Sequence, residues 1–494
     1  MSMTAIVQHL RENVGKMRSV EYRREQLRAL LRCIDENLDR WIEVLRKDLH
    51  KPKMECMGME VNYTRNELIV HLNNLDEWTK PEYVKKELPQ MRDECYIQYE
   101  PLGVILVIGA WNYPVQLVLC PLIAAISAGN CAVVKPSELS EATAALVEDL
   151  LPKYLDKDCF AVVNGGVKET TELLEQKFDH IMYTGNSNVG RIVMAAAAKH
   201  LTPVTLELGG KSPCYVDKDC DVDVAARRIA WGRFVNCGQT CIAPDYVLCA
   251  SQNQDRLLKG IQAALEEYFG KDPRQSEDYC RIVNQRHFHR VKSMIEKTKG
   301  SIALGGDSDE KDLYISPTVV KDVKPTDALM EAEIFGPVLP IVTAESADDA
   351  VRFINSRDKP LALYAFANDK KVIHDIVQRT SSGSVCGNDT MMQMALPTLP
   401  FGGVGTSGMG NYHGKFGFLT FSHRKAVMVK ALAMEKVNSI RYPPYTEKKM
   451  SWINWLTNKK EKRRGGLFSF MPFAVIMTIL AVLLKVLTVM TYLA

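Results

Sequence analysis

A polar turn with two thiols lies near the middle of the chain, and its residue types are those of a cysteine nucleophile. Between apolar segments it reads Asn236-Cys237-Gly238-Gln239-Thr240-Cys241-Ile242-Ala243-Pro244. A cysteine attacks a carbonyl carbon as its thiolate, and it needs N–H donors to hold the oxyanion that forms. Cys241 at such a turn presents its thiol and its own backbone N–H to one cavity. The alternative is a buried cysteine that acts only as a small hydrophobic residue.

Three other segments carry groups that such a nucleophile needs. Glu207 is flanked by apolar residues and followed by two glycines, so desolvation can raise its pKa toward that of a general base. Asn112 follows the apolar run 104–108 and can donate its side-chain amide to an oxyanion. Glu333 adds a second carboxylate beside Phe335. The alternatives are a surface glutamate at a strand end and an asparagine that only stabilises a turn.

These segments, in this order, resemble the aldehyde dehydrogenase superfamily. The short amino-terminus and the hydrophobic carboxy-terminal tail are most similar to its membrane-bound branch, which oxidises fatty aldehydes. One departure is Glu331, a second acid close to Glu333; the motif selects Glu333 and leaves open whether Glu331 shares its role. The likeness rests on Glu-Leu-Gly-Gly-Lys at Glu207, Gly-Gln-x-Cys at Cys241, Glu-Ile-Phe-Gly-Pro at Glu333, Trp111–Pro114, Pro400–Val404 and Ser407–Gly410.

The resemblance implies NAD-dependent oxidation of long-chain aliphatic aldehydes to carboxylic acids at a membrane surface. Cys241 would form a thiohemiacetal and then a thioester, while Asn112 and the Cys241 N–H hold the oxyanion. Glu207 would activate the water that hydrolyses the thioester. By the same resemblance, Glu333 and Phe335 hold the nicotinamide ribose and ring. Two other classes stay open: a cofactor-free thiol hydrolase or acyltransferase, and an inactive membrane-tethered scaffold of the same fold.

Two further segments are predicted to bind the cofactor. Residues 180–190 run from an expected strand into a turn and then into an expected helix over 191–199, whose amino-terminus can present N–H groups to a diphosphate. A bare Gly-x₄-Gly turn is more often a plain loop. Lys135 and Glu138 resemble the family's adenosine-ribose site, and a carboxylate there favours NAD over NADP; a capped helix start is the alternative. The complete predicted set is Trp111, Lys135, Glu138, Thr184, Gly185, Asn186, Ser187, Asn188, Val189, Gly190, Glu333 and Phe335.

The elements expected around these residues give an α/β fold. After about eighty residues of packing helices, continuous apolar runs alternate with helical stretches, which is typical of a doubly wound parallel sheet. Residues 1–206 are predicted to hold the amino-terminal helices and an NAD-binding domain, and 207–410 an α/β catalytic domain with the nucleophile. By resemblance, 411–445 form a return segment and, with 95–100, a small β-arm for subunit contact in a homodimer.

The carboxy-terminus predicts a membrane anchor. Residues 467–484 contain no charged side chain, and a bilayer core takes about 20 residues of helix. A transmembrane tail is therefore predicted over 467–491, preceded by an amphipathic basic segment over 446–466. The basic residues of this segment favour a cytoplasmic catalytic part. The resemblance implies a single span in the endoplasmic reticulum membrane, whereas the residues alone leave open which cytosol-facing membrane is used. A buried core helix is the alternative, and the role of Lys485 within the span is open.

Charge and cysteine usage exclude several other classes. The net charge is +3, and seven Lys or Arg against two Glu between Glu447 and Arg464 contribute +5 of it, which leaves about −2 for the rest. The main body is therefore not basic, and no nucleic-acid partner is predicted. Thirteen cysteines without paired spacing indicate a reducing compartment and no disulfides. No His or further Cys lies close to Cys237 and Cys241, so no metal site is predicted.

Overall fold

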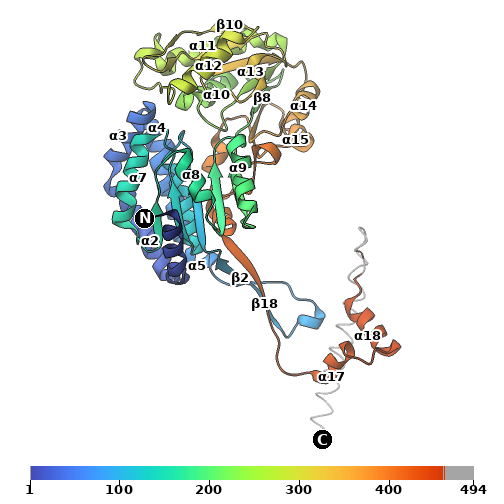
Figure 1. The fold of residues 1–494 in the computed structure, drawn as a ribbon. Helices are drawn as coiled ribbons and strands as arrows, with labels where there is room; N and C mark the ends of the chain where they lie inside the picture. The colour runs from blue at the N-terminus through green and yellow to red at the C-terminus, as the bar shows by residue number, and fades with distance from the viewer. Residues whose placement is uncertain (1, 460, 462–494) are drawn as a thin grey trace, which may run out of the picture. The chain divides into compact units, whose positions relative to one another are not determined.

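Two mainly parallel sheets with helices packed on them make up most of the chain in this computed structural model, which describes residues 2–459 and 461 (Figure 1). The chain divides into two compact units, residues 1–82 with 96–426, and residues 83–95 with those from 427 on. Both large sheets and all candidate site residues belong to the first unit. The predicted α/β fold with parallel sheets is confirmed.

The amino-terminal segment is helical, as predicted. Leu27, Leu30 and Ile34 recur at three- and four-residue spacing and are buried on one face of their helix. These helices pack on one another and on the helices of the first sheet. Their bounds are α1 Met3–Asn13, α2 Val20–Glu36, α3 Leu38–Leu49, α4 Lys53–Glu55, a π-helical turn Cys56–Val61, and α5 Asn62–Trp78.

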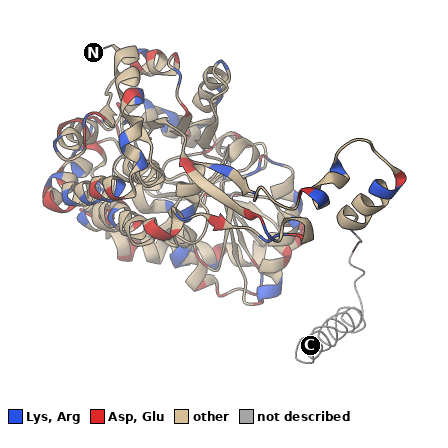
Figure 2. Cartoon of the chain, turned by 90° about the horizontal axis from the view of Figure 1, so that it is seen from below, with Lys and Arg blue, Asp and Glu red and all other residues tan. Residues whose placement is uncertain are grey.

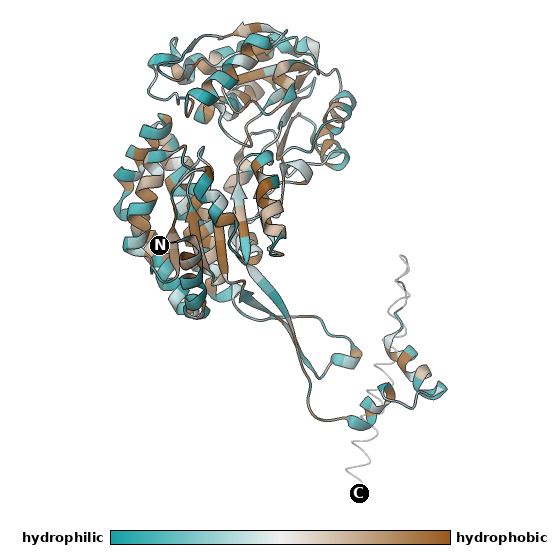
Figure 3. Ribbon diagram, viewed as in Figure 1, coloured by the Kyte–Doolittle hydropathy of each residue, from teal (hydrophilic) through white to brown (hydrophobic). Residues whose placement is uncertain are grey.

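The first sheet has the strand order β17-β7-β6-β3-β4-β5. All neighbouring strands are parallel except β17, which is antiparallel to β7. Its central strands are apolar on both faces because helices cover both sides, and they are brown in Figure 3. The strands are β3 Val104–Ile108, β4 Cys131–Lys135, β5 Phe160–Val162, β6 His180–Thr184, β7 Val204–Glu207 and β17 Gly408–Met409, and the helices are α6 Gln116–Ala128, α7 Glu141–Tyr154, α8 Val167–Leu174 and α9 Ser187–Ala198.

The second sheet has seven strands in the order β10-β13-β14-β9-β8-β15-β16, and all pairs except β10 with β13 are parallel. Its strands are β8 Pro213–Val216, β9 Tyr246–Cys249, β10 Ser301–Leu304, β13 Thr318–Lys321, β14 Val338–Thr343, β15 Ala362–Phe366 and β16 Ser384–Gly387. Its helices are α10 Val222–Phe234, α11 Ser251–Phe269, α12 Gln285–Lys297, α13 Ala328–Glu331, α14 Ala347–Asn355 and α15 Lys370–Arg379, and a short hairpin pairs β11 Ser308–Asp309 with β12 Tyr314–Ile315. Lys and Arg alternate with Asp and Glu over the helices (Figure 2), in agreement with a main body that is not basic.

The remaining elements follow or interrupt this body. Helix α16 Gly414–Thr420 precedes strand β18 Ser422–Val429, which joins β1 Glu82–Tyr83 and β2 Glu94–Pro101 in a three-stranded sheet of order β1-β2-β18. The last described helices are α17 Glu435–Asn438 and α18 Glu447–Thr457. The predicted span over 467–491, with Lys485, lies outside the described residues, and no helix within 2–459 is long and apolar enough to cross a membrane.

Candidate active site

The nucleophile loop begins where α10 ends. Asn236, Cys237 and Gly238 follow one another in the left-handed region, with φ angles of 51°, 53° and 71°. A non-glycine residue in this conformation costs about 1–2 kcal/mol, so the surroundings must hold it. Only glycine fits at position 238, because the Cβ of any other residue would come within 2.3 Å of the Gly336 carbonyl oxygen. The chain turns sharply here and brings Cys241 to a partly exposed position.

Side-chain amides and one carboxylate hold this loop in place. The backbone N–H of Asn236 donates to Glu55 Oε2 at 3.0 Å, and its side-chain Nδ2 donates to the carbonyl oxygens of Asn112 and Gln239 at 2.9 and 3.0 Å. Gln239 in turn donates to the Arg281 carbonyl at 2.9 Å and accepts the N–H of Val283 at 3.0 Å. The polar residues around the thiol are therefore mostly occupied in shaping the loop.

The two thiols of the loop lie in different surroundings. Burial raises the pKa of Cys241, and the nearby carboxylates of Glu333 and Glu207 raise it further, while its own N–H and that of Ile242 lower it. The thiol is therefore protonated at rest and needs a base before it attacks. Cys237 is fully buried, where burial raises its pKa to about 12, and its Sγ donates to the Tyr279 hydroxyl at 3.6 Å. Only Cys241 is accessible to a substrate.

Glu207 ends β7 and is a buried carboxyl without a protein partner. Only 2% of its surface is exposed, and neither carboxyl oxygen has a hydrogen-bond partner among the described residues. Burial raises its pKa well above the ordinary value for Glu. An unpaired buried carboxyl is costly for folding, and orphaned atoms of this kind mark a place for a water molecule or a ligand. Because its charge also acts on Cys241, the carboxyl lies close to the thiol.

Asn112 lies in the loop after β3 and is nearly fully buried. Its Nδ2 donates to the Gln239 carbonyl at 3.0 Å. A side-chain amide nitrogen carries two N–H groups, so a second donor remains on Nδ2. Asn112 therefore joins the nucleophile loop directly and carries a donor of the kind that an oxyanion needs.

The predicted aromatic residues meet a histidine that sequence reasoning missed. The rings of Trp111 and Phe335 lie edge to face with centroids 5.3 Å apart, and the Trp111 and His287 centroids are 4.9 Å apart. Burial, followed by the charges of Arg290 and Arg286, lowers the pKa of His287 to about 4. Its Nδ1 has no hydrogen-bond partner within the described part of the chain. The one sequence signal was its place in the first turn of a helix capped by Asn284.

A polar cavity of about 580 Å³ is lined by loops and helix ends that connect the strands of the two large sheets. Asn186, Ser187 and Asn188 of the predicted cofactor set line it with Glu333, and the open candidate Glu331 lines it too. Burial, and the nearby Asp245, raise the pKa of Glu333 to about 8, whereas the Gly210 N–H lowers it. Three basic residues that were not predicted also line the cavity: Lys211, Arg357 and Lys359.

The predicted start of the helix at residue 191 is wrong. Helix α9 begins at Ser187, because the Asn186 side chain caps it by accepting the N–H groups of Asn188 and Val189, each at 3.0 Å. The predicted residues 187–190 are therefore the first turn of the helix. Gly190 faces Leu208, since a Cβ would come within 2.9 Å of that side chain, so it serves packing.

Other predicted cofactor residues lie elsewhere. Lys135 ends β4, is nearly fully buried, and its Nζ lies 3.4 Å from Glu138 Oε2. Thr184 Oγ1 is buried without a partner among the described residues. The described lining of the polar cavity does not include Trp111, Lys135, Glu138, Thr184, Gly185, Val189, Gly190 or Phe335.

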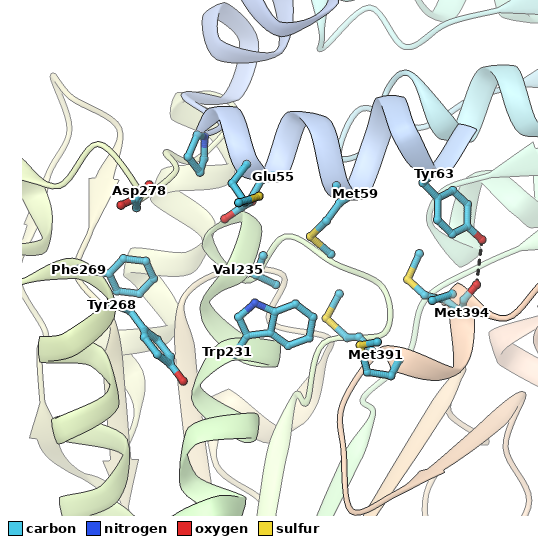
Figure 4. A pocket seen from close by; sticks show the side chains of 15 residues that line it. Glu55, Met59, Tyr63, Trp231, Val235, Tyr268, Phe269, Asp278, Met391 and Met394 are labelled. Carbon is cyan, nitrogen blue, oxygen red and sulfur yellow. Dashed lines mark hydrogen bonds between the residues drawn. The ribbon is translucent and has the colours of Figure 1, made fainter. Parts of the chain in front are cut away.

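A second cavity, which is apolar and has a volume of about 500 Å³, is lined in part by residues that precede the nucleophile loop (Figure 4). Trp231 and Val235, just before the loop, face Met59 and Tyr63 of the amino-terminal helices in Figure 4. The Tyr63 hydroxyl donates to the Met394 carbonyl oxygen at 3.0 Å. The complete lining is Pro52, Met54, Glu55, Gly58, Met59, Tyr63, Trp231, Val235, Tyr268, Phe269, Asp278, Met391, Met392, Met394 and Ala395.

The chain is similar to known proteins over nearly its whole length. The model of the aldehyde dehydrogenase family matches residues 4–427. Aldehyde dehydrogenase family 3 member A2 of Rattus norvegicus is 50% identical over 481 residues, which cover 97% of this chain and 99% of that protein. The dimeric NADP-preferring aldehyde dehydrogenase of Mus musculus is 53% identical, with 90% of this chain and 98% of that protein covered.

A solved structure agrees with this. The structure titled as the substrate-bound state of Staphylococcus aureus AldH superposes with a TM-score of 0.89 at 40% identity, and covers 92% of this chain and 99% of that one. These likenesses do not favour the cofactor-free hydrolase or the inactive scaffold. The chain therefore belongs to the aldehyde dehydrogenase family and is an oxidoreductase that acts on aldehydes with a nicotinamide cofactor.

Proposed function

We propose that this enzyme oxidises long-chain aliphatic aldehydes to carboxylic acids with NAD, and that Cys241, Asn112 and Glu207 carry the chemistry. The observation that carries the proposal is one arrangement: a partly exposed thiol near the carboxylates of Glu207 and Glu333, with an apolar cavity of about 500 Å³ lined in part by Trp231 and Val235, which precede the nucleophile loop. An apolar cavity of this size accommodates an alkyl chain, and its methionine and aromatic side chains offer apolar surface to methylene groups.

The mechanism follows from the groups around the thiol. Ionised Glu207, whose oxygens have no hydrogen-bond partner among residues 2–459, accepts the Cys241 proton. The thiolate then attacks the aldehyde carbon, and the Asn112 Nδ2 and the Cys241 N–H hold the oxyanion of the thiohemiacetal. A bound nicotinamide supplies the acceptor for the hydride that leaves this carbon. Glu207 releases the proton from Cys241 to solvent and then takes a proton from water, which attacks the thioester. The bond between the acyl carbon and the Cys241 sulfur breaks, the sulfur leaves as the thiolate, and the carboxylic acid is released.

The polar cavity fits a dinucleotide. The start of α9 lines this cavity, and the positive end of its helix dipole favours the negative charge of a diphosphate. Glu333 offers a carboxylate to ribose hydroxyls, and Gly209 makes room for it, since a Cβ on Gly209 would come within 2.0 Å of Glu333 Oε2. We propose that the remaining predicted residues, including Lys135, Glu138 and Phe335, complete this site.

The choice of NAD over NADP rests on Glu138. A carboxylate accepts a hydrogen bond from a ribose 2′-hydroxyl but repels a 2′-phosphate. One relative, from Mus musculus, is named as NADP-preferring, so the preference of the present chain for NAD has to be measured. Measured kcat/KM for the two cofactors decides it. Equal values in the unmodified enzyme and in Glu138→Gln would remove the carboxylate as the determinant.

Membrane attachment and dimerisation complete the proposal. We propose a homodimer with a single carboxy-terminal span in the endoplasmic reticulum membrane and the catalytic part in the cytoplasm. The exposed Trp452 and Trp455 on α18, beside Lys448 and Lys449, support contact with a membrane surface. Truncation after Thr446 should release an enzyme that keeps its activity on short aldehydes and loses efficiency on long ones presented in vesicles.

The substrate class is tested by NADH absorbance with a series of straight-chain aldehydes. Each methylene that enters an apolar cavity contributes about 0.8 kcal/mol, so kcat/KM should rise by up to about fourfold per methylene until the cavity is full. A flat series would contradict the proposed substrate class while leaving aldehyde oxidation itself in place.

A further inference from the structure

A fully buried ion pair next to Asn112 has no part in the mechanism above. Lys51 Nζ lies 2.5 Å from Glu60 Oε1, and neither side chain is exposed at all. Burial raises the pKa of Glu60, and the Lys51 charge opposes this. The desolvation of two buried charges often costs as much as their attraction returns, so an apolar pair would fill this space at similar stability. The hydrogen bonds of Lys51 and Glu60 to the loop that carries Asn112 indicate a role other than stability.

Both partners bind the loop that carries Asn112. Lys51 Nζ donates to the Asn112 carbonyl oxygen at 2.8 Å and lies 4.0 Å from the centre of the Tyr113 ring. Glu60 Oε2 accepts the backbone N–H groups of Val115 and Gln116, both at 3.1 Å, where α6 begins. The ion pair therefore holds the loop at both ends, and these N–H groups are among those that a helix start leaves without a backbone partner.

The same carbonyl also joins the oxyanion donor to the nucleophile loop. Asn236 Nδ2 donates to the Asn112 carbonyl oxygen at 2.9 Å, so this oxygen receives one donor from Lys51 and one from the nucleophile loop. A shift of Lys51 would therefore move the backbone of Asn112 relative to Cys241. Since Asn112 Nδ2 is the proposed oxyanion donor, its distance from the reacting carbon depends on this contact.

The local helix geometry places Glu60 for this task. Residues Cys56–Val61 form a π-helical turn, in which hydrogen bonds join residues five apart. Glu55 and Glu60, five residues apart, therefore point to the same side, and Glu55 accepts the Asn236 N–H of the nucleophile loop. One short segment thus contacts both loops of the site.

We propose that Lys51 and Glu60 are positioning residues that set the oxyanion donor Asn112 against the nucleophile Cys241. The inference rests on the proposed role of Asn112 as oxyanion donor, and it adds two residues that take no part in the proposed mechanism. Misplacement by about 1 Å costs roughly a hundredfold in rate, so loss of the pair should lower kcat without much effect on binding.

The test is the double variant Lys51→Met/Glu60→Gln, which leaves no unpaired buried charge. We expect kcat for aldehydes to fall by about ten- to a hundredfold, with KM for aldehyde and for cofactor within about twofold. Acylation of Cys241 by p-nitrophenyl acetate, which forms an oxyanion, should slow to the same degree. Alkylation of Cys241 by iodoacetamide, which forms none, should keep its rate.

A cycle with Asn112→Ala separates this inference from the proposed function. If the pair acts through Asn112, its loss should have little further effect on kcat in the Asn112→Ala background. An unchanged kcat in Asn112→Ala itself would contradict the proposed role of Asn112. A large effect of that variant together with a fully additive effect of the pair would instead overturn only the present inference.

A matched control is His71→Asn. His71 and Glu67 form another fully or nearly fully buried pair, at 3.2 Å, which binds Ser127 rather than either site loop. This variant should lower the melting temperature and leave kcat unchanged. A double variant at Lys51 and Glu60 that behaves like this control, or that slows iodoacetamide as much as the ester, would overturn the inference. If the double variant does not fold, Lys51→Met alone is used, and failure of both to fold would make the pair structural.

Discussion

Two cavities of similar volume, about 580 and 500 Å³, differ in how the chain builds them. The polar cavity is lined mainly by loops and helix ends, including the capped start of α9 at residues 186–188 after β6 and the loop 209–211 after β7. The apolar cavity is lined mainly by helix faces, in α10, α11 and the segment 52–63, with the loop 391–395. Ligands of α/β proteins bind at the loops that follow the carboxyl ends of parallel strands, so the position of the polar cavity can be predicted from the sequence. Helix faces that line a cavity show the same spacing of apolar residues as helix faces that pack in a core, so the apolar cavity cannot be predicted in this way.

The largest effect is expected at Cys241, the proposed nucleophile. Cys241→Ala should lower turnover by at least about 10⁴-fold, because the other thiol of this loop, Cys237, is fully buried and does not replace the nucleophile. Cofactor binding in the polar cavity, measured by calorimetry, should stay within about twofold. Cys237→Ser is the control and should keep most of the activity. Residual turnover above about 1% in Cys241→Ala would remove this thiol as the nucleophile.

The second effect concerns the base. Glu207→Gln keeps the shape of the side chain but cannot take a proton from water, so steady-state turnover should fall by about 10²–10⁴-fold. A burst of NADH and a thioester on Cys241, detected by mass spectrometry, should appear if hydrolysis is slowed more than hydride transfer. Absence of both the burst and the adduct, with normal turnover, would assign the hydrolytic base elsewhere.

A third change should act on the polar cavity alone. Glu333→Gln replaces a charged acceptor by a neutral one, and hydrogen bonds to charged groups contribute about 1.5–3 kcal/mol, so KM for the cofactor should rise about ten- to a hundredfold. The dependence of kcat/KM on aldehyde chain length should not change. Glu331→Gln, at an exposed position of the same cavity, serves as the comparison. Equal effects of the two variants would show that both acids hold the cofactor.

The fourth change should act on the apolar cavity alone. Met59→Gln places a polar amide in the lining, and a buried amide without a partner costs about 1–3 kcal/mol. We expect kcat/KM to fall by roughly tenfold for the longest aldehydes and little for the shortest, with KM for the cofactor unchanged. Met57→Gln, on the same helical turn but outside the described lining, is the matched control. A uniform loss across chain lengths would separate the cavity from substrate recognition.

The smallest effect is on stability and depends on pH. The folded-state pKa of Glu207 is raised above its unfolded value, so the folded protein binds the extra proton, and stability falls as pH rises from about 4.5 toward the folded pKa. Glu207→Gln removes this decrease in stability with rising pH, because glutamine does not titrate. Its melting temperature should equal that of the unmodified enzyme near pH 4.5 and exceed it by about 1–2 °C per pH unit above that. A difference that does not change with pH would contradict an unpaired, buried carboxyl.

Much of the fold was predictable because local rules and tertiary packing agree. Strand β3 is a continuous apolar run in a sheet covered on both faces, and β4 follows in the same pattern. The predicted start of α9 was wrong because Asn186 caps the helix, and the helix therefore begins before Gly190 and includes it. His287 was missed because its one local signal, a place in the first turn of a capped helix, does not indicate a functional site. It contacts Trp111 only in the folded chain, where α12 packs there. The division into domains and the roles of the site residues stay predictions.

The sequence by itself determined the family and the candidate site residues. Cys241, Glu207, Asn112 and Glu333 stand in segments whose composition and spacing are local properties, so one chain is enough to find them. Only the tertiary structure decided the environments that make them work. The orphaned oxygens of Glu207, the buried Lys51–Glu60 pair behind Asn112 and the apolar cavity beside Val235 each depend on contacts between residues far apart in the chain. Desolvation and cavity shape are properties of packing, and packing is not written in any single segment.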